Sequence, residues 1–361
     1  MGRRSLVRGV TKLVAAAVAP ALKPAPASAA DAPVADMSLE NALHVPERII
    51  PVPRDISPEG QKFLANGARA LQHGGGMPSP GTDKDAWRKL IVMVNKAYDP
   101  IVDKMLASPA KVERKTIGGA NVCVGTPNAM RHPDRARMTM HKGGFMLLGG
   151  RYVEGEAAEG AAESGCVTFA VDYRMPPDFP FPTALDDCVA AYREIIKSYD
   201  PRKIAVSGQS AGANLTTTLT LKLLELGLPL PGALGMMTIP SDMSQMGDTL
   251  KTNFGVDTVL GSKLDDTIAL YANGHDLKDP YLSPVFGDFT RGFPPSFLQS
   301  GTRDVLLSDT VRMHRALLKA GVEAELHVWE AMPHGGFSHG APENLEIHEQ
   351  FRKFMDKHLA G

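Results

Sequence analysis

Cysteine is scarce in this sequence. Cys123, Cys166 and Cys188 are its three cysteines, and they lie far apart along the chain. An odd number of widely spaced cysteines makes neither a disulfide framework nor the paired spacing of a zinc site. We therefore expect three buried free thiols and no cysteine-bound metal.

Long apolar runs and an excess of one charge are also absent. No stretch reaches the roughly eighteen apolar residues that a membrane-spanning helix needs, so no stable membrane anchor is expected. The 39 lysines and arginines nearly balance the 40 aspartates and glutamates, for a net charge of -1. This balance argues against a nucleic-acid partner. With 43% hydrophobic and 22% charged residues, the composition is that of an ordinary globular protein.

Residues 1–30 differ from the rest of the chain. "MGRRSLVRGVTK" is basic and has no acid, "LVAAAVAPAL" is a short apolar stretch, and Ala27-Ser28-Ala29 offers a cleavage site. This order predicts a signal peptide, and the arginine pair before apolar residues favours the twin-arginine route of export. The protein is then periplasmic or secreted. The alternative is a basic, unstructured N-terminus on a cytoplasmic protein.

Residues 31–110 are expected to form an N-terminal arm and cap helices. The arm, residues 31–57, is rich in proline and has no helical period. Ser57, followed by Pro and Glu, is typical of a helix N-cap. A second amphipathic pattern begins near Asp83 and predicts another helix, with a kink or stop near Pro100. Because no strand separates the two helices, we expect them to lie as a cap over the domain that follows.

Strand and helix patterns alternate over residues 111–361. Eight short strands are expected, at "KVERKTI", "ANVCVGT", "ARMTMH", "CVTFAVDY", "KIAVSG", "GALGMMTIP", "PSFLQSG" and "VEAELHVWE". Most of them are separated by helical patterns, which predicts an α/β domain with a mostly parallel sheet between helices. Residues 241–279 contain no clear strand and are a candidate second piece of the cap.

A serine between two glycines stands where one of these strands meets a helix. The strand "KIAVSG" leads through Gly208-Gln209-Ser210-Ala211-Gly212 into a long apolar helix. A tight turn at this joint strains its central residue and exposes the side chain, and glycine allows strand and helix to approach closely. Ser210 is therefore the candidate nucleophile of a G-x-S-x-G elbow. A packing turn of small residues is the alternative for an isolated motif.

A serine nucleophile requires a base and an orienting acid, which follow it along the chain in the order acid, then histidine. His334 lies just past the last strand, in "HVWEAMPHGGFSHG", and is the candidate base, with His339 as the fallback. The strand "PSFLQSG" is the one before the last. Asp304 lies in the loop after it, two residues past Gly-Thr, and is the candidate acid. Asp309 is better placed as the N-cap, or near-cap, of the next helix.

The loop after the third strand offers oxyanion-binding amides. In "HKGGF" two adjacent glycines, Gly143 and Gly144, allow two backbone N–H groups to turn toward one point. The N–H of Ala211, directly after the serine, is the third candidate donor.

Together these motifs resemble the hormone-sensitive-lipase-like esterases, bacterial family IV of the α/β-hydrolases, from about Val112 to the C-terminus. The family's His-Gly-Gly-Gly motif corresponds to His141-Lys142-Gly143-Gly144, with His141 as a supporting residue. Gly208 and Gly212 match the elbow, although the family commonly has Asp where Gln209 stands. "DYRMPPDFPFPTALDD" and "DPYLSPVFGDF" are also similar to stretches of the family.

The resemblance implies a carboxylic ester hydrolase with an N-terminal cap, no metal, no organic cofactor and a tendency to form homodimers. It implies Asp304 and His334 as the partners of Ser210. Short-to-medium-chain, aryl or xenobiotic esters are the expected substrates. A lactonase or amidase of the same fold remains open, and a non-catalytic small-molecule receptor is the alternative of a different class. Lys142 either contacts an acidic substrate group or points to solvent.

Overall fold

The computed structural model describes residues 49–73, 80–260 and 264–359, together with Ala42, Leu43, Val45 and Glu47. The signal peptide predicted over residues 1–30 and most of the predicted arm lie outside the described residues. Within the described part, no helix has the length and apolar character needed to cross a membrane.

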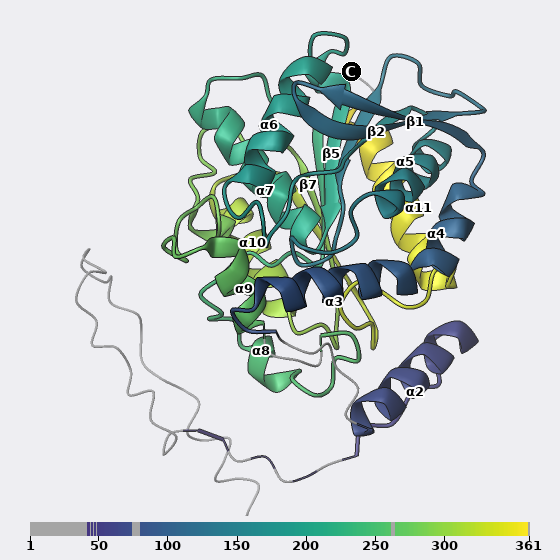
Figure 1. Cartoon of the computed structure of the whole chain (residues 1–361), viewed down its shortest axis with the longest axis vertical. Helices are drawn as coiled ribbons and strands as arrows, with labels where there is room; N and C mark the ends of the chain where they lie inside the picture. Colours follow the sequence, from purple (N-terminus) through teal and green to yellow (C-terminus); the bar gives the residue numbers. More distant parts are fainter. Residues whose placement is uncertain are drawn as a thin grey trace, which may run out of the picture. The chain divides into compact units, whose positions relative to one another are not determined.

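An eight-stranded sheet lies at the centre of residues 50–361 (Figure 1). Its order is β1-β2-β4-β3-β5-β6-β7-β8; β1 and β2 are antiparallel to their neighbours, and all other pairs are parallel. The prediction of a mostly parallel sheet is confirmed, and each expected segment contains one strand. The strands are β1 (Ala110–Ile117), β2 (Ala120–Pro127), β3 (Ala136–Met140), β4 (Val167–Val171), β5 (Ile204–Gln209), β6 (Ala233–Met237), β7 (Ser296–Gly301) and β8 (Ala324–Trp329).

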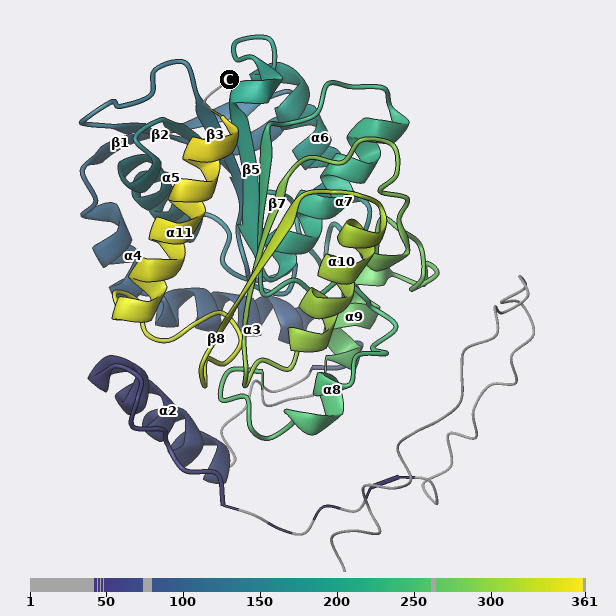
Figure 2. The ribbon, with the colours of Figure 1, turned by 180° about the vertical axis from the view of Figure 1, so that it is seen from behind.

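Helices cover both faces of the sheet, as the two opposite views agree (Figures 1 and 2). One face carries α5 (Arg151–Ser164) and α11 (Pro342–His358), and the other carries α6 (Thr183–Ile195), α7 (Ala211–Glu225) and α10 (Leu307–Lys319). The central strands β5, β6 and β7 are buried along almost their whole length. This burial explains their continuous apolar runs, because a strand covered on both faces has no solvent side. The three cysteines are buried and free, as predicted.

In the described part of the chain before the sheet there are three helices: α2 (Pro58–Gln72), α3 (Lys84–Ala97) and α4 (Asp99–Leu106). The Ser57 hydroxyl accepts a hydrogen bond from the amide of Gly60 at 3.0 Å, so the predicted N-cap is confirmed. The predicted break near Pro100 falls at Tyr98, between α3 and α4. Pro100 lies in the first turn of α4, where its missing N–H has no intrahelical partner to lose.

Within residues 241–260 and 264–279, which the structure describes, there is no strand. They contribute α8 (Thr249–Thr252) and α9 (Asp265–Ala272), which lie with α3 near the same end of the sheet (Figures 1 and 2). Short 3-10 helices at η2 (Pro201–Lys203) and η3 (Pro284–Phe286) lie in two of the connections.

Candidate active site

Ser210 is held in a strained turn between β5 and α7. Its backbone has φ 55° and ψ -119°, a conformation that a residue with a side chain rarely adopts. A Cβ on Gly208 would lie 2.2 Å from the carbonyl carbon of Gly212, and a Cβ on Gly212 would lie 1.9 Å from the oxygen of Met140. Only glycine fits at these two positions, because strand and helix backbones meet there without room for a side chain.

The structure brings the three predicted catalytic side chains together in one chain of hydrogen bonds. Ser210 Oγ lies 2.8 Å from His334 Nε2, and His334 Nδ1 lies 3.1 Å from Asp304 Oδ1. The three residues follow β5, β8 and β7, so they converge at the carboxyl edge of the parallel strands. Asp304 is fully buried and His334 is 6% exposed.

The Asp304 carboxylate is held from several sides. Its Oδ1 also accepts a hydrogen bond from the amide of Leu306 at 2.8 Å, and its Oδ2 accepts one from Ser300 Oγ at 2.8 Å. Burial by itself would lower the pKa of His334, but the charge and hydrogen bond of Asp304 raise it above its ordinary value. The imidazole is therefore a stronger base than a free histidine, and the protonated ring is stabilised.

The two alternative residues are engaged elsewhere. His339 Nε2 lies 2.8 Å from Glu159 Oε1, and is not part of the hydrogen-bond chain of His334. Asp309 lies in the first turn of α10, whose N-cap residue is Leu306, so its assignment as N-cap is wrong and only the near-cap position holds. Its Oδ2 accepts the amide of Asp242 at 3.0 Å. Burial raises the pKa of Asp309 to about 7.

The loop after β3 presents the predicted oxyanion amides. Gly143 and Gly144 have φ values of 115° and 60°, and the oxygen of Gly143 accepts the amide of Leu147 at 2.9 Å. The ring of Phe145 stacks on Tyr271 of α9 with centroids 3.8 Å apart, which anchors the loop. Among the described residues, the amides of Gly143, Gly144 and Ala211 donate to no protein acceptor. They are therefore free to bind an oxygen of a ligand.

His141 is the buried residue at the start of this loop. It is fully buried, and its ring stacks on Tyr173 with centroids 4.0 Å apart and an interplanar angle of 4°. Tyr173 Oη donates a hydrogen bond to the carbonyl oxygen of His141 at 2.9 Å. Burial lowers the pKa of His141 to about 4, so the ring is neutral near pH 7. A neutral, stacked ring can hold the backbone of the loop in place without adding a positive charge next to it.

A cavity of about 640 Å³ opens onto Ser210. This is within the range of roughly 300–1,000 Å³ for sites that enclose a small molecule. The N-terminal helices and residues 241–279 contribute part of its lining, beside the sheet, α5, α11 and the loops at the strand ends. Apolar side chains are prominent among the lining residues, including Val94, Tyr98, Met237, Met243, Leu250 and Val259.

Lys142 and Glu156 both line the cavity and interact electrostatically. Lys142 lines the cavity, and its positive charge opposes the rise in the pKa of His334. Glu156 of α5 also lines it, and burial raises the pKa of this carboxyl to about 7 against the influence of Lys142. Nothing in the sequence marked Glu156, since a glutamate in a helix usually faces solvent.

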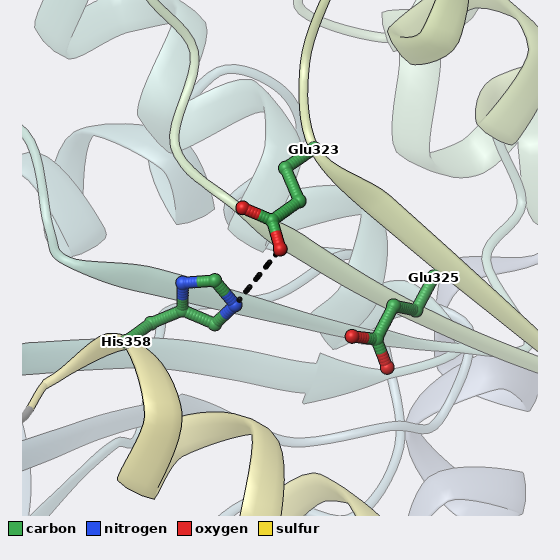
Figure 3. Close-up of side chains that lie close together, drawn as sticks. All are labelled: Glu323, Glu325 and His358. Atoms are coloured by element: carbon green, nitrogen blue, oxygen red, sulfur yellow. Dashed lines mark ion pairs between the residues drawn. The ribbon is translucent and has the colours of Figure 1, made fainter.

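One cluster outside the cavity has the composition of a cation site (Figure 3). Ligand atoms of Glu323, Glu325 and His358 lie within 4.8 Å of one another. Lys357 Nζ already lies 2.7 Å from Glu323 and 3.4 Å from Glu325, so a positive charge is present without a metal. The cluster adjoins the start of β8, whereas the catalytic loops follow strand ends, so it has no part in this site.

Comparisons with known proteins agree with this geometry. The sequence profile of a family described as "alpha/beta hydrolase fold" matches residues 137–338. An acetyl-hydrolase of Streptomyces hygroscopicus is 32% identical over 63% of this chain and 69% of its own length.

Two solved structures are similar over most of the chain. The crystal structure of esterase E25 has a TM-score of 0.80 and 34% identity, and covers 89% of this chain and all of its own. A bacterial hormone-sensitive-lipase-family esterase has a TM-score of 0.72 and 28% identity, and covers 84% of this chain and 99% of its own. This chain therefore belongs to the hormone-sensitive-lipase-like family of α/β-hydrolases and is a carboxylesterase of that family.

Proposed function

We propose that the enzyme hydrolyses carboxylic esters by acyl transfer to Ser210, with His334 as the general base and Asp304 as its orienting acid. The hydrogen-bond chain from Asp304 through His334 to Ser210 Oγ carries the proposal. A serine hydroxyl is a poor nucleophile near neutral pH unless a base lies within hydrogen-bond distance.

The reaction has two halves. First, Ser210 Oγ attacks the ester carbonyl carbon while His334 Nε2 takes the hydroxyl proton, and His334 then gives this proton to the alcohol as the C–O bond breaks. In the second half a water molecule attacks the acyl carbonyl and gives its proton to His334. Ser210 Oγ recovers a proton from His334 as the acid leaves. In both halves the amides of Gly143, Gly144 and Ala211 donate to the oxyanion.

The cavity supports small, apolar or aromatic esters as substrates. Its size fits one drug-sized molecule. Its apolar lining favours the binding of an acyl or aryl group over that of a charged group. The relative EstE5, 26% identical to this chain with a TM-score of 0.71, was soaked with p-nitrophenyl butyrate in its crystal. We propose short-to-medium-chain, aryl and xenobiotic esters as the substrate class.

The experiment that tests this proposal is turnover of p-nitrophenyl esters from acetate to decanoate, beside a p-nitroanilide of the best acyl group and a set of lactones. We expect a maximum at a short or medium chain and little turnover of the anilide, because the amide has the poorer leaving group. Equal anilide turnover would make the enzyme an amidase, and preference for cyclic esters would make it a lactonase. Binding without turnover of any of these would favour a receptor.

The oxyanion loop supplies a paired prediction. Gly143→Ala should lower kcat by about 100-fold or more, the loss expected for one oxyanion donor, because its Cβ would lie 2.3 Å from the Leu147 oxygen. Gly144→Ala is the matched control, since its nearest atom would be 3.4 Å away; it should lose no more than about 10-fold, from backbone strain near 1 kcal/mol. Steady-state kinetics on p-nitrophenyl butyrate measure both, and equal losses would contradict this steric explanation.

A further inference from the structure

Asp257 is a fully buried carboxylate that joins three loops around the active site. It lies between α8 and α9 and accepts four backbone N–H groups. Oδ1 accepts the amides of Val259 at 2.8 Å and Leu260 at 3.1 Å. Oδ2 accepts the amides of Val305 at 3.0 Å and His334 at 3.2 Å. Four N–H donors favour the ionised carboxylate.

The four donors belong to the cavity wall, the acid loop and the base loop. Val305 directly follows the orienting acid Asp304, and the fourth donor is the amide of the base itself. Val259 and Leu260 line the substrate cavity. One oxygen of Asp257 therefore holds the acid loop against the base loop, and the other holds the cavity wall.

The same segment holds the acid loop at a second place. Asn253 Nδ2 donates to the carbonyl oxygen of Asp304 at 2.9 Å and to that of Thr302 at 3.1 Å. Thr249 Oγ1 donates to the carbonyl oxygen of Val305 at 2.8 Å. These contacts reach the backbone on both sides of Asp304, so residues 249–257 form a brace along the loop.

Asp257 also adds a negative charge near the imidazole. Four groups face His334: Asp304 from the loop after β7, Asp257 from the brace, Lys142 from the loop after β3, and the Ser210 hydroxyl. Burial lowers the pKa of His334, the two carboxylates raise it, and Lys142 lowers it. Burial in turn raises the pKa of Asp257, while His334 and the backbone N–H groups oppose that rise.

We propose that Asp257 is a positioning residue of the esterase, which fixes the acid and base loops relative to each other and stabilises the imidazolium. The role rests on the proposed function of His334 as the base. It also links the cavity wall to the catalytic loops, because all three are held by one side chain.

The test replaces Asp257 with asparagine, which keeps the volume and removes the charge. Asp257→Asn should lower kcat by roughly 10- to 100-fold with little change in KM, as expected for a misplacement of about 1 Å. The acid limb of kcat/KM reports the pKa of the base in the free enzyme. That limb should move to lower pH in Asp257→Asn, and to higher pH in Lys142→Met, where a positive charge is removed. Asp248→Asn changes an exposed aspartate directly before the brace. It is the matched control and should leave kcat and the acid limb unchanged.

Titration of the His334 ring by NMR follows the same shifts without any substrate. This readout separates the two hypotheses: if Ser210→Ala keeps full turnover, the proposed function fails, yet the ring titration still tests Asp257. A lower melting temperature with unchanged kcat per titrated active site and an unchanged ring pKa would reduce Asp257 to a structural residue and overturn the proposal.

Asn253→Ala tests the brace where Asp257→Asn fails to fold. Its neutral side chain anchors only the acid loop, through two hydrogen bonds. Their loss should lower kcat by about 3- to 10-fold, with no movement of the acid limb. Full kcat in Asn253→Ala would contradict positioning by this segment.

Discussion

Replacing Ser210 with alanine should lower kcat for p-nitrophenyl butyrate by about 10⁶-fold, the scale of loss when a serine nucleophile is removed. The alanine has no oxygen to attack the ester, while the cavity and the oxyanion amides remain. KM should change little, since the serine adds little to ground-state binding. Steady-state rates at high enzyme concentration measure the loss.

Ser338→Ala is the matched control for that variant. Ser338 also lines the cavity, but it has no place in the hydrogen-bond chain of His334, so near-normal turnover is expected. A fluorophosphonate should add one mass increment to the parent and to Ser338→Ala, and none to Ser210→Ala. Labelling of Ser210→Ala, or turnover that survives in it, would mean that Ser210 is a packing turn.

Asp304→Asn should give the second largest effect, a fall in kcat of about 10⁴-fold. The asparagine keeps the shape of the side chain, but it loses the charge that stabilises the imidazolium of His334. Its amide nitrogen can also hold the ring in the wrong tautomer, with Nε2 protonated and unable to accept the serine proton. Kinetics on the same ester measure the change, and circular dichroism checks that the fold is kept.

Asp309→Asn separates this role from the general effect of removing a buried carboxylate. Asp309 accepts the amide of Asp242 at 3.0 Å and does not reach His334, so its variant should keep kcat within a few-fold. Equal losses in the two variants would remove Asp304 from the reaction and point to a shared structural cause.

Local chemistry explains why much of the candidate site could be predicted. The elbow depends on steric limits between neighbouring backbones, and Gly208 and Gly212 are required by contacts of about 2 Å that any Cβ would create. The acid and base could be found because parallel strands place their following loops at one edge. Asp304 and His334 are close to the ends of β7 and β8, so their positions follow from the fold class.

Residues that act through distant contacts could not be predicted. Asp257 lies in a segment without a strand pattern, and its bonds to Val305 and His334 span 48 and 77 residues. The burial of Glu156 and the effect of the Lys142 charge on its pKa also depend on tertiary packing. No periodicity records such contacts, because they depend on the path of loops rather than on the repeat of an element.

The sequence by itself determined the sheet-forming segments, the elbow turn, the candidate oxyanion glycines and the order of the candidate catalytic loops, since each follows from local backbone limits or from strand direction. The tertiary structure decided which titratable groups surround His334, which segment braces the acid loop and which side chains shape the cavity. Those features arise from the packing of residues 241–279 and of the N-terminal helices over the strand ends. Such packing depends on side-chain contacts between segments far apart in the chain, and these exist only once the chain has folded.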